Sequence, residues 1–223
     1  MSLTGRGRSH AAVFAMLAAA LLAPGALQAQ TLPFEVVPFG GVVLPMGWLV
    51  EQGTANLKHR PAVTFGGRLD AWLTRSTAAE LSLSYSTSGY HATSGSGQVT
   101  DTIGGLFAAT GRVVYRFARS GRVSWLANGG AGVLVHSGTY LEDRAAAGRT
   151  HFTGVAGLSS RIQVSEGVAL LLAVEDYVCS VKLSGITGIT PAAHLDNYPV
   201  LSLGVVVPLG ARGEDDDDYR VIR

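Results

Sequence analysis

The chain contains very little cysteine and little charge, and after its N-terminus it contains no long apolar run. Cys179 is the single cysteine among 223 residues, so no disulfide can form within the chain. Charged residues make up 15% of the chain, and no basic patch suited to nucleic acid is visible. No later segment reaches the roughly 18 consecutive apolar residues that indicate a membrane helix. These absences exclude a disulfide-stabilised fold and argue against nucleic acid as a partner and against a helical membrane protein.

The N-terminal segment has the features of a secretion signal. Arg6 and Arg8 give it a positive start, residues 11–22 form a short apolar core, and small residues follow. This order predicts a signal peptide over residues 1–29. The apolar core is too short to cross a bilayer of roughly 30 Å. The rest, about 190 residues, is the size of one domain, which we place at residues 30–209.

What the chain does contain is a series of segments in which apolar and polar residues alternate. In the clearest segment, one face carries Val63, Phe65, Gly67, Leu69, Ala71 and Leu73, and the other carries Thr64, Gly66, Arg68, Asp70, Trp72 and Thr74. A period of two predicts a strand with two different faces. By this pattern we expect eight strands, at residues 33–44, 62–74, 78–89, 103–117, 122–136, 150–163, 167–181 and 197–209.

The links between these segments alternate in length. Three are of hairpin size, at residues 75–77, 118–121 and 164–166, and four are longer, at residues 45–61, 90–102, 137–149 and 182–196. Short periplasmic turns and long outer loops are typical of bacterial outer-membrane barrels. We therefore predict an all-β fold, an eight-stranded antiparallel up-and-down transmembrane β-barrel. It would lie in the outer membrane of a Gram-negative-type bacterium, with both termini in the periplasm.

The polar faces of the predicted strands carry the charged residues expected inside the barrel. These are Arg68, Asp70, Glu80, Arg112, Arg116, Arg161 and Glu175. The interior of an eight-stranded barrel is just wide enough for side chains to fill it, and charges buried there must pair because their desolvation is costly. We predict a charge network that fills the lumen, in which Glu80 bridges Arg68 and Arg112, and Arg161 approaches Glu175.

Two histidines mark the outer mouth of the predicted barrel. His136 and His151 flank the third long link and both point inward, so they could face each other there. Such a pair could bind a metal or act as a proton switch; the alternative is that they are exposed polar residues. Ser137 follows His136 directly, which puts the two side chains on opposite faces and argues against a nucleophile and base. We predict no catalytic residues, no metal site and no cofactor.

The last predicted strand resembles the assembly signal of outer-membrane barrels. A polar residue, a glycine and two apolar residues stand at its characteristic spacing, as Ser202, Gly204, Val207 and Leu209. With the link pattern and the glycine-rich first strand, residues 31–209 resemble the small eight-stranded outer-membrane barrels of the OmpA/OmpX type. The resemblance implies outer-membrane lipid as the surroundings, and the barrel-insertion machinery and periplasmic chaperones as partners during assembly.

A run of acidic residues follows the last strand. Glu214 and the four aspartates after it repel one another and stay solvated, so we expect residues 210–223 to form a disordered periplasmic tail. The run lacks the glycine and the spaced oxygen ligands of a calcium loop.

Several functions are compatible with this sequence. The leading hypothesis is a non-enzymatic integral outer-membrane barrel with a structural or surface-interaction role. The alternatives are a narrow, porin-like pore, an outer-membrane lipid-modifying enzyme, or a secreted soluble lipocalin-like binding barrel, which would need an apolar interior and a polar exterior. No ligand for the long links is indicated, because a fold does not fix its function.

Overall fold

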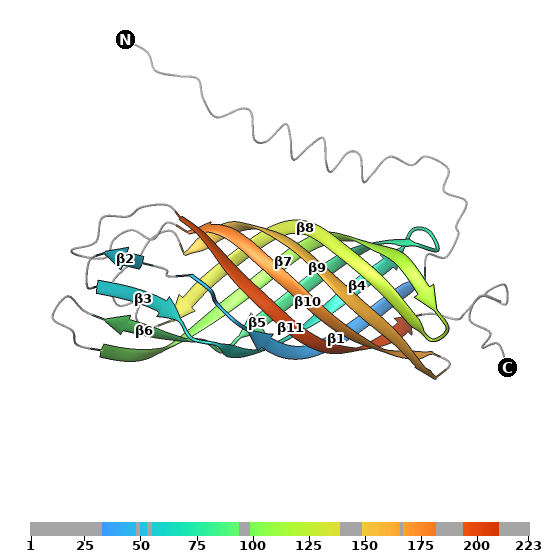
Figure 1. Ribbon diagram of the computed structural model, residues 1–223, viewed down its shortest axis with the longest axis horizontal. Helices are drawn as coiled ribbons and strands as arrows, with labels where there is room; N and C mark the ends of the chain where they lie inside the picture. The colour runs from blue at the N-terminus through green and yellow to red at the C-terminus, as the bar shows by residue number, and fades with distance from the viewer. Residues whose placement is uncertain are drawn as a thin grey trace, which may run out of the picture. The chain divides into compact units, whose positions relative to one another are not determined.

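The computed structural model describes residues 33–47, 50–52, 55–93, 99–138, 149–165, 167–181 and 194–209. The predicted signal peptide and acidic tail lie outside these ranges. Eight antiparallel strands form a closed barrel (Figure 1), which confirms the predicted fold class. In order around the barrel, they are β1 (Phe34–Val43), β4 (Ala62–Trp72), β5 (Thr77–Ser86), β7 (Val99–Ser120), β8 (Val123–Gly138), β9 (Thr150–Ser165), β10 (Val168–Val181) and β11 (His194–Leu209).

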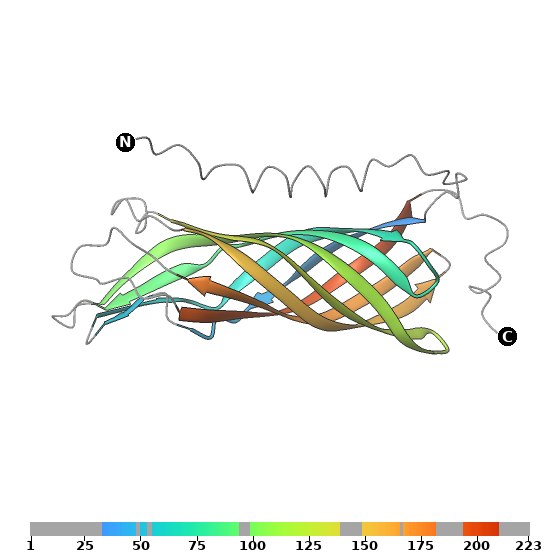
Figure 2. The same ribbon diagram turned by 90° about the horizontal axis from the view of Figure 1, so that it is seen from above.

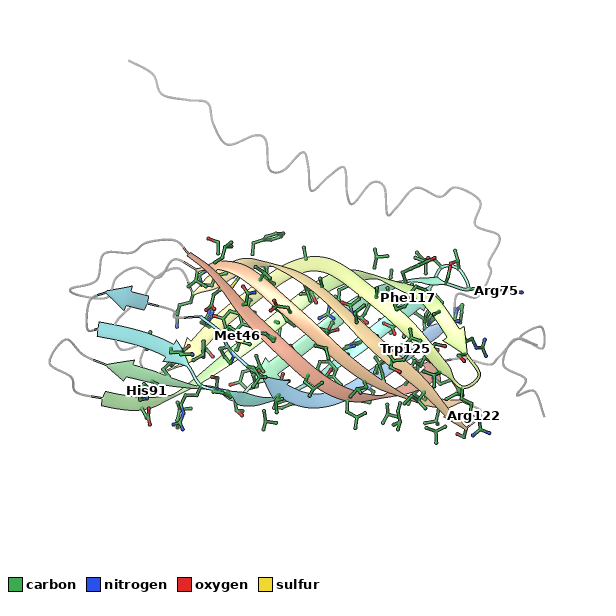
Figure 3. All side chains as sticks on the ribbon, viewed as in Figure 1. Met46, Arg75, His91, Phe117, Arg122 and Trp125 are labelled. Atoms are coloured by element: carbon green, nitrogen blue, oxygen red, sulfur yellow. The ribbon has the colours of Figure 1, made fainter. Side chains whose placement is uncertain are left out.

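The alternation in the sequence corresponds to an inside and an outside of the barrel. On β5, Glu80 and Ser82 are buried, whereas Leu81 and Leu83 are exposed by 51% and 46%. Exposed apolar side chains occur on the outward face of every barrel strand (Figure 3). Such an exterior is the reverse of what the lipocalin-like alternative requires. Among the described residues there is no helix long and apolar enough to span a bilayer.

The interior is built in layers along the barrel. Near one end, Trp72, Val114 and Leu126 belong to a buried apolar cluster, and toward the other end Leu106 and Tyr198 belong to a second one. A group of buried charges lies between the two clusters, as β7 shows, where Arg112 stands between Ala108 of the second cluster and Val114 of the first.

Three short strands extend the sheet beyond the barrel at one end, as Figure 2 also shows. They are β2 (Val50–Gln52), β3 (Ala55–His59) and β6 (Gly89–Thr93), and β6 pairs with residues 99–103 of β7. We call these four segments the extension, and the opposite end, which carries the turns at residues 73–76 and 121–122, the turn end. The prediction that residues 45–61 and 90–102 are loops was therefore wrong, because the strand ladder continues past the ends of β4 and β5.

The seam between β1 and β11 closes the barrel. Pro38 removes one hydrogen bond from this seam, and neither Val37 nor Pro38 pairs with β11, yet the register is the same on both sides. The ladder therefore passes Pro38 without a bulge.

Gly41 allows a close approach of the two strands at this seam. A Cβ at Gly41 would overlap the Leu201 carbonyl oxygen and the Ser202 backbone, whereas a Cβ at Gly40 would meet only the Thr64 oxygen at 4.0 Å. Because the Gly41 clash involves backbone, we expect Gly41→Ala to cost about 1–3 kcal/mol and Gly40→Ala to cost clearly less. Unfolding in urea, followed by the gel shift between folded and boiled protein, measures both. Equal stability of the two variants would contradict this prediction.

Candidate functional site

Glu175 is the centre of a charge network that crosses the barrel. Its carboxylate accepts hydrogen bonds from Arg112 Nη1 at 2.6 Å, Asn128 Nδ2 at 3.1 Å and Arg68 Nη2 at 3.2 Å. Arg112 Nη1 also lies 3.2 Å from Glu80 Oε1. We call Arg68, Glu80, Arg112, Asn128 and Glu175 the central layer. Their charged side chains are at most 3% exposed, so the ion pairs are held away from solvent.

Further contacts fix the arginines of the central layer. Arg112 donates to Thr110 Oγ1 at 2.8 Å and to the Tyr177 hydroxyl. Arg68 donates to Ser202 Oγ at 3.1 Å, and its guanidinium lies 4.7 Å from the centre of the Phe39 ring. With these contacts the central layer connects β4, β5, β7, β8, β10 and β11.

A second group of polar contacts lies nearer the turn end. Arg161 Nη1 and Nη2 donate to the two oxygens of Glu35 at 2.7 and 2.8 Å, and Trp72 Nε1 donates to Glu35 at 2.8 Å. The Arg116 guanidinium lies 4.5 Å from the centre of the Trp72 ring. These contacts join β1, β4, β7 and β9 across the lumen.

The structure corrects the predicted network in two respects. Arg161 pairs with Glu35 and not with Glu175, because the β9–β10 register pairs Glu175 with Gly157, four residues away from Arg161. Glu35 was missing from the predicted set, although it lies on the same face of its strand as Val37, which is buried with it. Glu80 contacts Arg112 as predicted.

Asp70 differs from the other acids of the lumen. It is buried, it pairs in register with Glu35 on one side and Glu80 on the other, and its Oδ1 has no hydrogen-bond partner in the described part of the chain. The structure therefore places Asp70 between two other acids.

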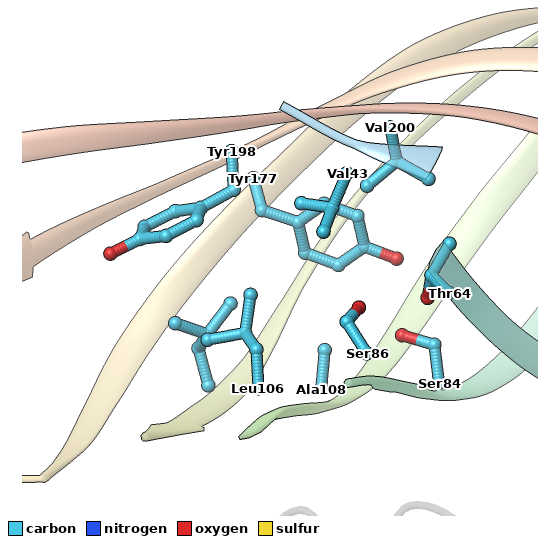
Figure 4. Close-up of a pocket in the computed structure, with 10 residues that line it drawn as sticks. Val43, Thr64, Ser84, Ser86, Leu106, Ala108, Tyr177, Tyr198 and Val200 are labelled. Atoms are coloured by element: carbon cyan, nitrogen blue, oxygen red, sulfur yellow. The ribbon is translucent and has the colours of Figure 1, made fainter. Parts of the chain in front are cut away.

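Little space remains between the central layer and the extension. Figure 4 shows the cavity there, where the Tyr177 and Tyr198 rings face apolar side chains and small polar ones, among them Thr64, Ser84 and Ser86. The centre of a water molecule can occupy only about 10 Å³ of this cavity. The cavity therefore has room for about one water. The cavity is too small for a substrate.

Three histidines meet where the barrel joins the extension. The ring centroid of His136 lies 5.0 Å from that of His59 and 5.1 Å from that of His151. His136 Nε2 is 2.9 Å from the Tyr198 hydroxyl, which donates to Asp196 Oδ2 at 2.7 Å. We call the three histidines and Tyr198 the mouth cluster. The predicted pair His136 and His151 is thus brought together, and all three histidines are buried.

His59 is the histidine of the mouth cluster that the sequence did not predict. It comes from β3, its Nδ1 lies 3.0 Å from Ser88 Oγ, and its ring packs 4.5 Å from that of Tyr90. Burial lowers the pKa of His59 from 6.5 to about 3, so His59 is neutral at pH 7. Among the described residues, no group of three or more His, Cys, Asp or Glu side chains is arranged to hold a metal ion.

The four residues of the proposed assembly signal point to both sides of β11. Ser202 is buried and contacts Arg68. Gly204 is buried too, and a Cβ there would lie only 2.8 Å from Val37 Cγ1. Val207 and Leu209 are exposed on the outer face.

Comparisons with known proteins give a structural match but no sequence match. No protein-family model and no curated protein matches the chain. The crystal structure of the outer membrane protein OprG from Pseudomonas aeruginosa is similar with a TM-score of 0.60 at 10% identity, over 81% of this chain and 97% of OprG. The solid-state NMR structure of the outer membrane protein AlkL in lipid bilayers is similar with a TM-score of 0.54 at 14% identity, over 82% and 94%. The chain therefore has the fold of the small eight-stranded outer-membrane barrels.

Proposed function

We propose that the protein is an integral outer-membrane barrel. The observation that carries this proposal is the apolar outer face of all eight barrel strands, combined with buried ion pairs inside. A soluble monomer rarely exposes apolar patches larger than a few hundred Å², whereas a lipid-facing barrel needs an apolar band with aromatic residues at its borders. Tyr115, Phe117 and Trp125 are exposed at the turn end, where Figure 3 labels the last two. We assign the turn end to the periplasm.

Gel mobility and solubility test the proposed location. Folded barrel protein from the outer-membrane fraction should migrate differently before and after boiling and should require detergent to dissolve. Identical migration of the two samples, together with solubility in plain buffer, would contradict the proposal.

We further propose that the barrel does not conduct ions and is not an enzyme. The central layer and the Glu35–Arg161 pair cross the lumen, and the cavity beyond them has room for about one water. In planar bilayers we expect no conductance steps from the wild-type protein, because an ion would have to displace paired buried charges. Asp70 is not one of the residues that contact Glu175. Replacing Asp70 by Asn should therefore also give a barrel without conductance steps. Reproducible conductance steps from the wild type would contradict it.

The role that we propose for the closed barrel is to anchor the extension as an interaction surface. The outward face of the extension carries a polar cross-strand row of Lys58, His91 and Asp101. Asp101 lies 3.2 Å from Arg60 and 2.9 Å from His91, beside a groove of about 360 Å³ that Arg60 and Ile103 help to line. If the extension binds a partner, replacing Arg60 and His91 by Gln should abolish that binding. The same replacements should leave the barrel folded.

Assembly of the barrel completes the proposal. We propose that Ser202, Gly204, Val207 and Leu209 are what the barrel-insertion machinery recognises, with periplasmic chaperones acting before insertion. The exposed positions of Val207 and Leu209 support this role.

A further inference from the structure

The turn end of the barrel carries a pocket lined by four arginines. Arg116 and Arg119 come from β7, Arg122 from the β7–β8 turn and Arg161 from β9, and Ser124, Gln163 and Gly121 complete the lining. Figure 3 shows Arg122 at this end. Among the described residues, no Asp or Glu side chain lines the pocket, so the described lining is positively charged.

The cationic charge of this pocket is only partly compensated in the described part of the chain. The Arg161 guanidinium is paired with Glu35. Arg116 stacks on Trp72, and its buried Nε has no hydrogen-bond partner there. Neither Arg116 nor Arg122 contacts a carboxylate of the described residues. An anionic ligand would therefore find guanidinium groups available, and guanidinium groups match carboxylates well.

The chain carries a segment of the complementary charge close to this pocket. The last strand ends at Leu209, which pairs with Phe34 at the turn end. Five residues later begins Glu214-Asp215-Asp216-Asp217-Asp218, an uninterrupted run of five acids. At about 3.3 Å per residue, Glu214 can reach about 17 Å from Leu209 and Asp218 about 30 Å, which is enough to cross the mouth of a barrel this narrow.

We propose that the acidic segment Glu214–Asp218 binds in the arginine pocket formed by Arg116, Arg119, Arg122 and Arg161. The interaction is electrostatic and partly exposed to solvent, so it weakens as salt shortens the screening length from about 10 Å at 0.1 M to about 3 Å at 1 M. It does not depend on which side of a membrane the turn end faces.

A distance measurement in the full chain tests this proposal. Spin labels are attached at Ser165→Cys on the rim of the turn end and at Tyr219→Cys directly after the acids; Cys179 is buried and stays unlabelled. We expect a narrow distribution of distances at low salt and a broad one at 1 M salt. Replacing Arg119 and Arg122 by Gln should lower the narrow population several-fold. Arg75→Gln, at an exposed arginine of the other turn at this end, is the matched control and should leave the distribution narrow.

Two results would overturn the proposal. One is a broad distribution at low salt in the wild type, which would show that the tail does not bind. The other is a narrow distribution that the Arg119 and Arg122 replacements leave unchanged, which would place the tail elsewhere. Weaker binding of vesicles containing anionic lipid by the double variant, without any change in the distances, would assign the pocket to lipid instead. The gel shift on boiling confirms for each variant that the barrel is folded.

Discussion

Replacing Glu175 by alanine is expected to lower the free energy of unfolding by about 3–5 kcal/mol, the cost of leaving buried charge without its partner. Glu175 accepts hydrogen bonds from both Arg68 and Arg112, and all three side chains are at most 2% exposed. Without the Glu175 carboxylate, Arg112 keeps Glu80 at 3.2 Å. Among the described residues, the hydrogen bond left to Arg68 is the one to the neutral Ser202 hydroxyl. The loss should therefore arise mainly at Arg68.

Urea unfolding in detergent micelles, followed by tryptophan fluorescence, measures this loss. Asp70→Asn is the matched control, because Asp70 is a buried lumen acid whose Oδ1 has no partner in the described residues. This control should change the stability by less than about 1 kcal/mol. Adding Arg68→Met to Glu175→Ala should restore part of the lost stability, since it removes the uncompensated charge. If the single and double variants were equally unstable, Arg68 would not be the origin of the loss.

The barrel and its two faces could be predicted from the sequence because each strand meets two different environments. Outside, residues such as Leu81 and Leu83 are apolar and exposed, and inside, Glu80 and Ser82 need polar partners, so the alternation is regular. Which charges pair could not be predicted. Glu35 and Arg161 are 126 residues apart in sequence. The contact between these two side chains depends on the tilt and register of the strands in the closed barrel.

The extension was missed for a related physical reason. Beyond the apolar band the outer face becomes polar, so Lys58, His91 and Asp101 replace the apolar half of the alternation. The inward half persists in Leu57 and His59, which are both buried. In the sequence, His59 stands between polar neighbours and resembles a loop residue. Of the mouth cluster, only His136 and His151 could therefore be predicted.

Acidification is expected to loosen the extension through His59. The pKa of His59 is about 3 in the folded protein and 6.5 when the histidine is exposed. The opened state therefore binds the proton more tightly, and the stability of the closed state is full above pH 6.5 and falls as the pH drops toward 3. One proton gives a loss of about 1.4 kcal/mol per pH unit. The described side chains that contact His59 add no negative charge, since they are Ser88, His136, Tyr90 and Tyr198.

Hydrogen exchange of the β3 and β6 amides, corrected for the intrinsic effect of pH, measures this opening. Between pH 6.5 and 5 we expect protection to fall by about 15-fold, because the loss from one proton approaches tenfold per pH unit only below pH 6.5. His59→Gln should remove most of this pH dependence, whatever its effect on protection at pH 7. His91→Gln, at a half-buried histidine on the outward face of β6, is the matched control and should retain it. If His59→Gln kept the full pH dependence, another group of the mouth cluster would be the one that takes up the proton.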